Sequence, residues 1–472
     1  MAYKAYVTEL KNVRKHPNAD RLLLGDCFGN TVCVNLDYVE GQIGVYFPTD
    51  GQLSVEFADV NNLVRKKDEN GNNIGGYMDP DKRNVKAIKL RGEKSDGIFL
   101  PLQCLESFGD ITQLRVGDTI DVFNGHEICK KYIPRSNIRR GHYSEGNKTR
   151  KHKAPVAPLF MEHADTEQLA YNLDAFRCGD EIEITLKMHG TSQRTAYLPV
   201  FQKYKRNFVD WICGRPGTPI YDWGYVTGTR RTVLENYNGG YYGSNEFREQ
   251  HSKFFEGKLW KGEEVYYEVV GFTHTGAPIM AECANKKLND KDFIKQYGET
   301  TVFSYGCSPT GEGEPEMYWD EEKTEPCLIP IVPQSDIYVY RMTMTNEDGD
   351  VVEYTPDFMR YRCEQMGVKT VPVMWKGTIP QNPGSETDPT IEPGEWIKNV
   401  AERFYDGPDP IGKTHVRECV VVSILNRPKF CAYKHKNWSF KVLESIIKDT
   451  VDAPDMEEAQ ENVLAETEEI SV

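Results

Sequence analysis

A strand-like alternation that ends in a lysine and a glycine constrains this chain more than any other feature. Apolar and polar side chains alternate from residue 181, with Ile182, Ile184 and Leu186 on one face and Glu181, Glu183 and Thr185 on the other. This period of two predicts a half-buried strand whose polar face continues at Lys187. Gly190 then predicts a turn. The chain therefore presents one amine where a strand ends.

An amine is a useful nucleophile only when it is uncharged. We expect nearby cations and partial burial to lower the pKa of Lys187 enough to populate the neutral form. A surface lysine at a strand end is the plain alternative, because a single K-x-x-G match is a weak signal.

Two further lysines lie far downstream. Alternation places Lys434 and Lys436 on one face of a predicted strand. Two like charges side by side are unfavourable unless an anion lies between them, so the pair predicts a phosphate site. A solvated basic edge that prevents strand-to-strand association is the alternative reading.

Four more patches complete a series, at residues 227–232, 265–271, 337–341 and 417–422. Together with the two lysine segments, and in this order, they resemble motifs I, Ia, III, IIIa, IV and V of the covalent nucleotidyltransferases, specifically the ATP-dependent RNA ligases. The match spans roughly residues 160 to 445. Six motifs in order are far more specific than any one of them.

The resemblance implies a role for each matched residue. Lys187 would be the adenylylated nucleophile, and His189 would act in the later steps on the nucleic acid. Leu186 and Gly190 would line the nucleotide pocket. Arg231 would contact the 5′-phosphate or the nucleotide, and Arg230 is the second candidate for that contact.

Five residues further along complete the implied site. Glu268 would accept hydrogen bonds from the ribose hydroxyls, and Tyr340 would stack on adenine. Glu418 would hold a divalent metal, Mg²⁺ or Mn²⁺, as hard cations take oxygen ligands. Lys434 and Lys436 would grip the α-phosphate and expel pyrophosphate. The implied reaction passes AMP from ATP to the lysine and then to an RNA 5′-phosphate, and a 3′-hydroxyl finally displaces the AMP.

Two positions depart from the motif pattern. Tyr267 stands where a glycine usually precedes the motif III glutamate, and Cys419 stands where a glycine usually follows the motif IV glutamate. Glycine permits close backbone approach, so the geometry around Glu268 and Glu418 is less constrained by the motifs than that around Lys187. Outward polar positions on buried strands are the alternative reading of both carboxylates.

The amino-terminal region resembles nucleic-acid-binding OB domains. Residues 13–22 are similar to the opening of such domains, and residues 85–98 are similar to the OB module ahead of the transferase domain in the fifth, Deinococcus-type, RNA ligase family. A barrel of this kind can track a phosphate backbone, or can serve only as a packing partner. In DNA ligases and mRNA capping enzymes the OB domain follows motif V, whereas only 36 residues (472 minus 436) follow Lys436 here.

We therefore expect an α+β fold with an N-terminal OB-type β-barrel and a transferase domain built on antiparallel sheets. The expected division is an OB domain at 1–130, a basic linker at 131–157, a nucleotidyltransferase domain at 158–450 and an acidic disordered tail at 451–472. Helices are expected at 245–260, 357–366 and 395–405. The polar segments at 308–323 and 377–393 look like insertions, and their purpose does not follow from the sequence.

Charge is unevenly distributed along the chain. The net charge is -15, yet the stretch 130–153 contains nine basic residues against one acidic residue: Lys130, Lys131, Arg135, Arg139, Arg140, Lys148, Arg150, Lys151 and Lys153. This stretch could follow a phosphate backbone or could be a solvated linker. The acidic tail is expected to keep the protein soluble.

The 12 cysteines include no C-x-x-C pair, which makes structural zinc improbable and favours reduced thiols in a cytoplasm. No apolar run is long enough to cross a bilayer, and we expect a monomer without a membrane partner.

Three functions fit these observations. An ATP-dependent RNA ligase would leave AMP on Lys187 and join RNA ends, in single strands or in a nicked duplex. A GTP-dependent capping guanylyltransferase would label the same lysine from GTP alone. A catalytically inactive RNA-binding OB protein would bind RNA without any covalent nucleotide, as the departures at Tyr267 and Cys419 could suggest.

Overall fold

The structure is a computed structural model of the whole chain. It describes residues 3–67, 69–71, 74–133, 155–161, 163, 166–230, 233–234, 237, 245–312, 316–320, 325–329, 332–384, 390–427 and 429–449. Most of the expected basic linker, the acidic tail and parts of both expected insertions lie outside these ranges. Among the described residues, no helix is both long enough and apolar enough to span a membrane.

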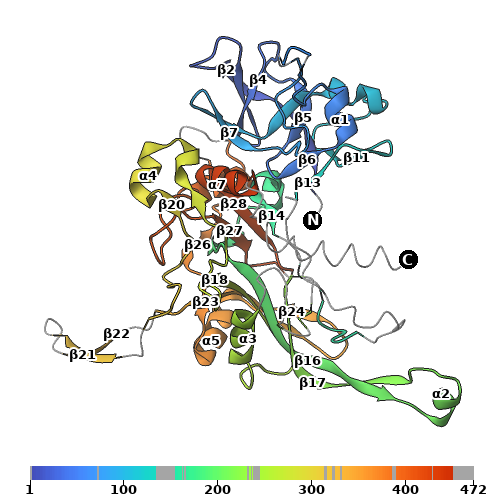
Figure 1. Ribbon diagram of the computed structural model, residues 1–472, viewed down its shortest axis with the longest axis vertical. Helices are drawn as coiled ribbons and strands as arrows, with labels where there is room; N and C mark the ends of the chain where they lie inside the picture. The colour runs from blue at the N-terminus through green and yellow to red at the C-terminus, as the bar shows by residue number, and fades with distance from the viewer. Residues whose placement is uncertain are drawn as a thin grey trace. The chain divides into compact units, whose positions relative to one another are not determined.

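Two compact units make up the chain (Figure 1). Unit 1 comprises residues 1–134 and returns at residues 438–449, and unit 2 comprises residues 135–437. The helix α7, Trp438–Asp449, therefore belongs with unit 1, although it lies inside the range expected for the transferase domain. The ion pair between Lys441 Nζ and Asp96 Oδ2, at 2.6 Å, ties this helix to unit 1.

Unit 1 is built from short antiparallel strands. Its largest sheet has the order β10-β1-β5-β9, with β1 at Ala5–Glu9, β5 at Ile43–Phe47, β9 at Ile98–Pro101 and β10 at Thr119–Ile120. A second sheet joins β2 (Lys11–Lys15), β3 (Leu23–Cys27) and β4 (Asn30–Val34). Three strand pairs complete the unit: β7 (Ala87–Leu90) with β8 (Glu93–Asp96), β6 (Gly51–Leu53) with β13 (Cys129–Lys131), and β11 (Val122–Phe123) with β12 (His126–Glu127). The core gathers around Val7, Val45 and Phe47, and the helix α1 (Val55–Val60) covers it with Phe57.

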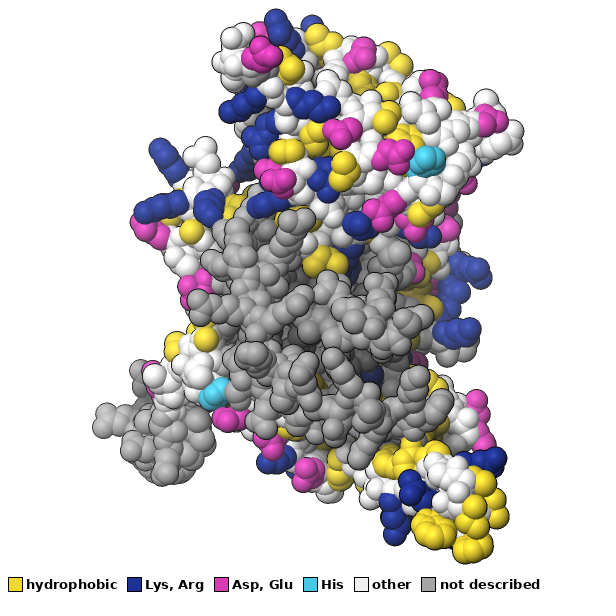
Figure 2. Space-filling model, turned by 45° about the vertical axis from the view of Figure 1, so that its right-hand side comes forward, with side chains coloured by type: hydrophobic (Ala, Val, Ile, Leu, Met, Phe, Trp, Pro, Cys, Tyr) yellow, Lys and Arg dark blue, Asp and Glu magenta, His cyan; other side chains and the backbone are white. Residues whose placement is uncertain are grey.

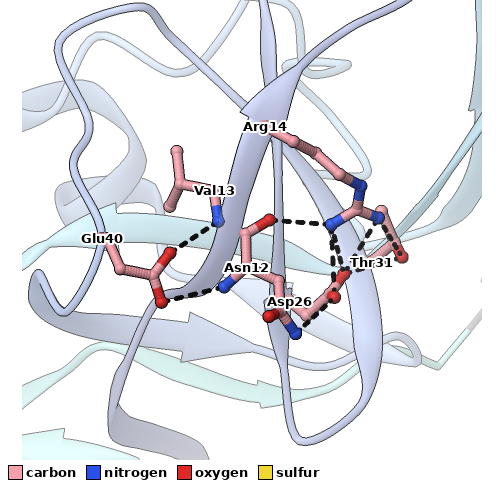
Figure 3. Close-up of polar contacts among 6 residues, drawn as sticks. All are labelled: Asn12, Val13, Arg14, Asp26, Thr31 and Glu40. Carbon is pink, nitrogen blue, oxygen red and sulfur yellow. Dashed lines mark hydrogen bonds and ion pairs between the residues drawn. The ribbon is translucent and has the colours of Figure 1, made fainter.

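The segment that resembles an OB opening is held by local polar contacts (Figure 3). Glu40 accepts hydrogen bonds from the main-chain N–H groups of Asn12, at 3.0 Å, and Val13, at 2.7 Å. The Arg14 guanidinium binds both carboxylate oxygens of Asp26, at 3.2 and 3.3 Å. The described strands of unit 1 pair as separate small sheets, without a closed ring of strands.

Unit 2 contains two larger sheets. The first has the order β14-β28-β27-β15-β26, with β14 at Glu167–Gln168, β28 at Ala432–Lys436, β27 at Cys419–Ile424, β15 at Glu181–Lys187 and β26 at Val373–Thr378. The second has the order β17-β16-β18-β23-β24, with β17 at Thr218–Gly228, β16 at Thr191–Lys205, β18 at Glu263–Gly271, β23 at Ser335–Thr345 and β24 at Val351–Glu353, and β25 (Lys369–Thr370) pairs with β23. The short pairs β19–β20 (Cys283–Ala284, Thr300–Thr301) and β21–β22 (Glu316–Asp320, Glu325–Ile329) lie outside both sheets.

Residues 188–190 carry the chain from the first of these sheets into the second. The alternation seen in the sequence explains how β15 packs in the first sheet, because Ile182 and Ile184 are fully buried in a core with Val420 and Val422. The opposite face of β15 is free to carry polar groups. The mixed architecture with antiparallel sheets agrees with the α+β expectation.

The three expected helices are confirmed, with bounds that differ from those expected: α3 at Glu246–Phe254, α5 at Pro356–Met366 and α6 at Pro393–Glu402. Four further α-helices of the described residues were not predicted, namely α1, α2 (Phe208–Ile212), α4 (Lys291–Tyr297) and α7. Three of these have only five to seven residues, which is too short for a helical period to stand out in a sequence.

Candidate active site

Lys187 is the last residue of β15, and its amine meets a carboxylate. Lys187 Nζ donates a hydrogen bond to Glu418 Oε2 at 3.0 Å. The lysine side chain keeps 29% of its surface exposed, whereas Glu418 keeps only 4%. The lysine side chain is therefore partly accessible while its partner is enclosed.

The expected depression of the Lys187 pKa is wrong for this state of the protein. Burial lowers the pKa of Lys187, but the charges of Glu418 and Glu268 offset the burial and raise that pKa above its ordinary value. The prediction assumed that cations would dominate around the amine. The nearest charges are carboxylates instead, so Lys187 carries its proton here.

Glu418 is the centre of the charged cluster. Its Oε2 also lies 3.4 Å from His189 Nδ1. Burial would raise the pKa of Glu418, but Lys187, His189 and Lys436 together hold that pKa well below its usual range. Asn437 fixes the main chain behind it, because Asn437 Nδ2 donates to the carbonyls of Arg417, at 2.7 Å, and Glu418, at 3.4 Å.

The strand register brings the distant lysine pair to the same face as Lys187. Lys187 pairs with Cys419 across β15 and β27, and Cys419 pairs in turn with Lys436 across β27 and β28. Lys434 occupies the next position on that face, opposite Val421. Paired residues in an antiparallel sheet share a face, so three lysine side chains emerge together.

Gly190 makes room for Glu268. A Cβ added at Gly190 would lie 2.4 Å from the Val269 carbonyl oxygen and 2.9 Å from Glu268 Cγ. No larger residue fits this approach without moving the main chain of β18. The close contact places the motif III carboxylate beside the turn that follows Lys187.

Tyr340 stands at an irregular point of β23. The register between β18 and β23 shifts between Tyr266 and Tyr267, so Tyr340 is the bulged residue between Val339 and Arg341 in this ladder. Its hydroxyl lies 3.3 Å from Ser192 Oγ, and its ring lies 6.0 Å from that of His163. The bulge aims this aromatic side chain towards the strand that follows the motif I turn.

The two departures from the motif pattern do not disturb the carboxylates. Tyr267 is fully buried, and its hydroxyl lies 2.9 Å from Thr195 Oγ1 on the face of β18 opposite Glu268. Cys419 is also fully buried, and burial raises the pKa of its thiol to about 12. Alternation places Tyr267 on the face opposite Glu268, whereas Cys419 shares the face of Lys187 and Lys436 and is buried between them in the register.

Leu186 lies next to Lys187 in β15, on the other face of the strand. Its side chain is buried and shares a face of the sheet with its partner Val420 on β27, whereas Lys187 lies on the opposite face. The period of two dictates this position, so only the main chain of Leu186 can face a nucleotide. Arg231 lies outside the described residues. The carbonyl of Arg230 accepts a hydrogen bond from His163 N–H at 3.0 Å, which fixes the entry into that segment.

A cluster of buried rings supports the motif I turn, and the sequence analysis did not identify it. Tyr305 is fully buried, and its hydroxyl accepts a hydrogen bond from the His189 main-chain N–H at 2.7 Å. The ring of Phe303 lies 4.5 Å from the His189 ring, edge on. His415 contacts Tyr305 at 4.5 Å, and its Nε2 lies 3.8 Å from Asp409. These residues carry no motif, so only the tertiary structure reveals their role.

The site suits a divalent cation bound largely through a ligand. No group of three or more His, Cys, Asp or Glu side chains among the described residues is arranged to hold a metal by itself. Glu418 is a buried carboxylate that is kept ionised, and Mg²⁺ typically takes one or two protein carboxylates together with water and phosphate oxygens. The donor set therefore fits a metal that enters with a phosphate ligand.

Among known proteins, similarity to this chain is found at the level of the fold. No family model matches the sequence, and no curated protein matches it either. Solved structures of an RNA ligase from Naegleria gruberi are similar in fold. A mutant with ATP and Mn is 15% identical, with a TM-score of 0.52 and coverage of 93% of this chain and 98% of that chain. A second mutant with ATP and Mn is 14% identical, with a TM-score of 0.51 and the same coverage. The ligase with PPi is 15% identical, with a TM-score of 0.50 and coverage of 92% and 97%. The chain thus has the fold of these RNA ligase structures.

Proposed function

We propose that this protein is an ATP-dependent RNA ligase that joins 3′-hydroxyl and 5′-phosphate ends through a lysyl-AMP intermediate. The observation that carries the proposal is the convergence of Lys187, Lys434 and Lys436 from β15 and β28 onto one polar face, where Glu418, the residue before β27, accepts a hydrogen bond from Lys187. The fold shared with RNA ligase structures supports it. Two of those Naegleria structures hold ATP and Mn, and we extend both ligands to this chain.

In the first step, the amine of Lys187 attacks the α-phosphorus of ATP. A nitrogen–phosphorus bond forms, the bond to pyrophosphate breaks, and the amine releases a proton. Lys434 and Lys436 lie on the same face and neutralise the charge that develops on the phosphates. The Glu418 and Glu268 carboxylates raise the pKa of Lys187, so the amine must lose its extra proton before it attacks, and a cation bound to Glu418 would lower that pKa.

Glu418 would hold the divalent metal, Mg²⁺ or Mn²⁺. When bound, the metal would supply positive charge that balances the phosphates and weakens the hold of Glu418 on Lys187. Lys187, His189 and Lys436 keep the buried Glu418 carboxylate ionised for this duty.

Glu268 and Tyr340 would hold the nucleoside. Glu268 lies against Gly190 and would accept hydrogen bonds from the ribose hydroxyls. Tyr340 is aimed from its bulge and would stack on adenine. Gly190 and the main chain of Leu186 would border the pocket.

The later steps act on the RNA. AMP passes from Lys187 to the 5′-phosphate, and a 3′-hydroxyl then displaces AMP to close the phosphodiester. His189 shares Glu418 with Lys187 and would position these phosphates. Arg231 would bind the 5′-phosphate or the nucleotide, with Arg230 as the second candidate.

Unit 1 would bind the nucleic acid. We assign residues 1–130 to an OB-type domain of the Deinococcus-type ligases, residues 131–157 to a basic linker, residues 158–450 to the adenylation domain, except for α7, which belongs to unit 1, and residues 451–472 to an acidic tail. Arg14 in the OB-like segment is already paired with Asp26, so other cations of unit 1 would contact phosphates. We place the enzyme in a cytoplasm as a monomer that acts in RNA repair.

An end-joining assay tests the function. The protein is incubated with ATP and Mg²⁺ or Mn²⁺ on matched nicked and single-stranded substrates that carry RNA or DNA on each side of the break. We expect joining when the broken strand is RNA, and none with Lys187→Ala. Lys376→Ala, on the neighbouring strand β26, is the matched control and should retain activity. Joining that requires GTP, or RNA binding without joining, would contradict the proposal.

A further inference from the structure

Strands β16 and β17 extend far beyond the sheet that contains the site. Only Thr191–Ala196 of β16 pairs with β18, whereas pairing with β17 continues to Lys205. The outer part of the hairpin is therefore a two-stranded arm, and Figure 1 shows it projecting with α2 at its end. The arm comprises residues 197–205 of β16, and at about 3.3 Å per residue these nine residues span roughly 30 Å.

The arm is stiffened along its length. The rings of Tyr197 and Tyr225 stack at 4.7 Å, and Phe201 and Tyr221 meet at 6.0 Å. At the tip, a capping box closes α2, in which Asn207 and Asp210 exchange hydrogen bonds. An isolated two-stranded ribbon is at best marginally stable, so these contacts indicate an arm that must hold its end in a defined place.

That end is apolar and exposed. Four of the five residues of α2 are large and apolar, and each is more than half exposed: Phe208 at 73%, Val209 at 58%, Trp211 at 68% and Ile212 at 62%. A connection between two strands normally needs a few polar turn residues. A helical turn that is apolar on all sides is normally buried, so the tip has the composition of a surface that something covers.

Basic residues surround the apolar tip. Lys203, Lys205, Arg206 and Arg215 are all exposed, and Figure 2 shows dark-blue side chains beside the yellow ones in the region of α2. Asp210 is engaged in the capping box. The net charge of -15 belongs mostly to the body of the chain. The arm separates the tip from that body by roughly 30 Å, which exceeds the Debye length of about 8 Å at physiological salt, so the negative charge of the body is screened at the tip. The tip therefore presents a locally cationic face.

We propose that the tip of this arm docks on an anionic lipid bilayer. Trp and Phe beside aliphatic side chains, bordered by Lys and Arg, suit the interface between headgroups and acyl chains. The apolar side chains would enter the interface while the four cations meet lipid phosphates. We expected no membrane partner because no apolar run could cross a bilayer, but a peripheral tip needs none.

Two other occupants fit less well. RNA would suit the cations and the aromatic rings, but Val209 and Ile212 have no flat face on which a base can stack. A second copy would bring the same cations against each other, and a stable dimer buries about 800 Å² per partner, which takes about 20 residues. The bilayer alone uses both the aliphatic and the basic residues.

Vesicle flotation of the full-length protein tests the proposal. The probes are vesicles of phosphatidylcholine alone and vesicles that also contain phosphatidylserine. We expect the protein to float with the anionic vesicles, and Phe208→Ser/Trp211→Ser to lower the bound fraction at least tenfold. The double substitution Lys205→Gln/Arg206→Gln removes two positive charges and should lower binding to anionic vesicles by about 25-fold, at about fivefold per cation. Leu36→Ser/Val39→Ser, at 57% and 62% exposure in unit 1, is the matched control and should float like the wild type.

Each other outcome overturns the proposal. Absence of flotation, or equal loss in the control variant, excludes a lipid-binding tip. If the tip variant instead abolishes RNA binding or concentration-dependent self-association while vesicle binding is absent, the occupant is RNA or a second copy. The tip variant should still take up AMP from ATP, so failure here is separate from failure of the proposed enzyme function.

Discussion

At the scale of single residues, Gly190 allows the motif I turn to lie directly against strand β18, because glycine has no side chain. Gly190→Ala would drive a methyl group against the Val269 carbonyl, which belongs to the main chain and cannot yield. We expect AMP transfer to Lys187 to fall at least about 100-fold, because small displacements at a reacting centre have effects of this size. Labelled ATP in a single-turnover assay measures this.

Gly224→Ala is the control for that substitution. Its added Cβ would meet Val200 side-chain atoms at 3.4 Å and nothing closer. It should leave AMP transfer unchanged, and equal losses in the two variants would show that the close approach at Gly190 is unimportant.

Tyr305 is a positioning residue, because its hydroxyl touches the motif I turn and not a reacting atom. Tyr305→Phe would leave the His189 N–H without its buried acceptor, at a cost of about 1 to 3 kcal/mol. We expect the rate of AMP transfer to fall about tenfold or more while the KM for ATP changes little. Tyr361→Phe on α5, which is exposed, should match the wild type. A raised KM with an unchanged rate would assign Tyr305 to nucleotide binding instead.

At the scale of elements, one buried ion pair joins α5 to β18. Arg362 binds both oxygens of Glu263, at 2.8 and 2.7 Å, and both side chains are almost fully buried. Arg362→Met leaves a buried carboxylate without its cation, so the free energy of unfolding should fall by about 3 to 5 kcal/mol. Lys369→Met breaks an exposed pair with Asp336 and should cost less than about 1 kcal/mol. Urea unfolding measures both, and similar losses would contradict the difference in burial.

His251 gives α3 a pH-dependent stability. Burial lowers the pKa of His251 to about 4, although Asp336 opposes the shift. Between that value and the ordinary 6.5, the unfolded chain binds a proton that the folded chain does not, so stability falls as the pH falls. We expect a loss on the order of 2 kcal/mol between pH 7 and pH 4 that His251→Gln removes. An unchanged slope of Tm against pH in that variant would rule this out.

The sequence predicts these elements unevenly, for physical reasons. Alternation along 181–187 and 432–436 identifies strands and faces, because a period of two survives any tertiary arrangement. The same alternation also assigns Leu186 to the far face, which the motif resemblance overrode. Tyr305 could not be found, since it lies 116 positions from its partner His189 and no local pattern links them. The direction of the Lys187 pKa shift also required coordinates, because it depends on which charges lie nearest.

At the scale of the whole molecule, the chain closes unit 1 with residues from its far end. The helix α7 buries Phe440 and Leu443 and forms the Lys441–Asp96 ion pair. Truncation after Asn437 should therefore destabilise unit 1 by several kcal/mol, as removal of buried Phe and Leu does elsewhere. Hydrogen exchange in β7 and β8 should accelerate strongly. Truncation after Asp449 is the control, and equal protection in both shortened chains would show that α7 does not stabilise unit 1.

The covalent carrier is the feature on which the other assignments depend. Intact mass spectrometry after incubation with ATP and Mg²⁺ or Mn²⁺ tests it most directly. We predict that the wild-type chain gains the mass of one AMP, that Lys187→Ala gains nothing, and that Lys376→Ala gains it like the wild type. A wild-type chain without added mass, or a Lys187→Ala chain that still acquires AMP, would contradict the assignment of Lys187 as the nucleophile.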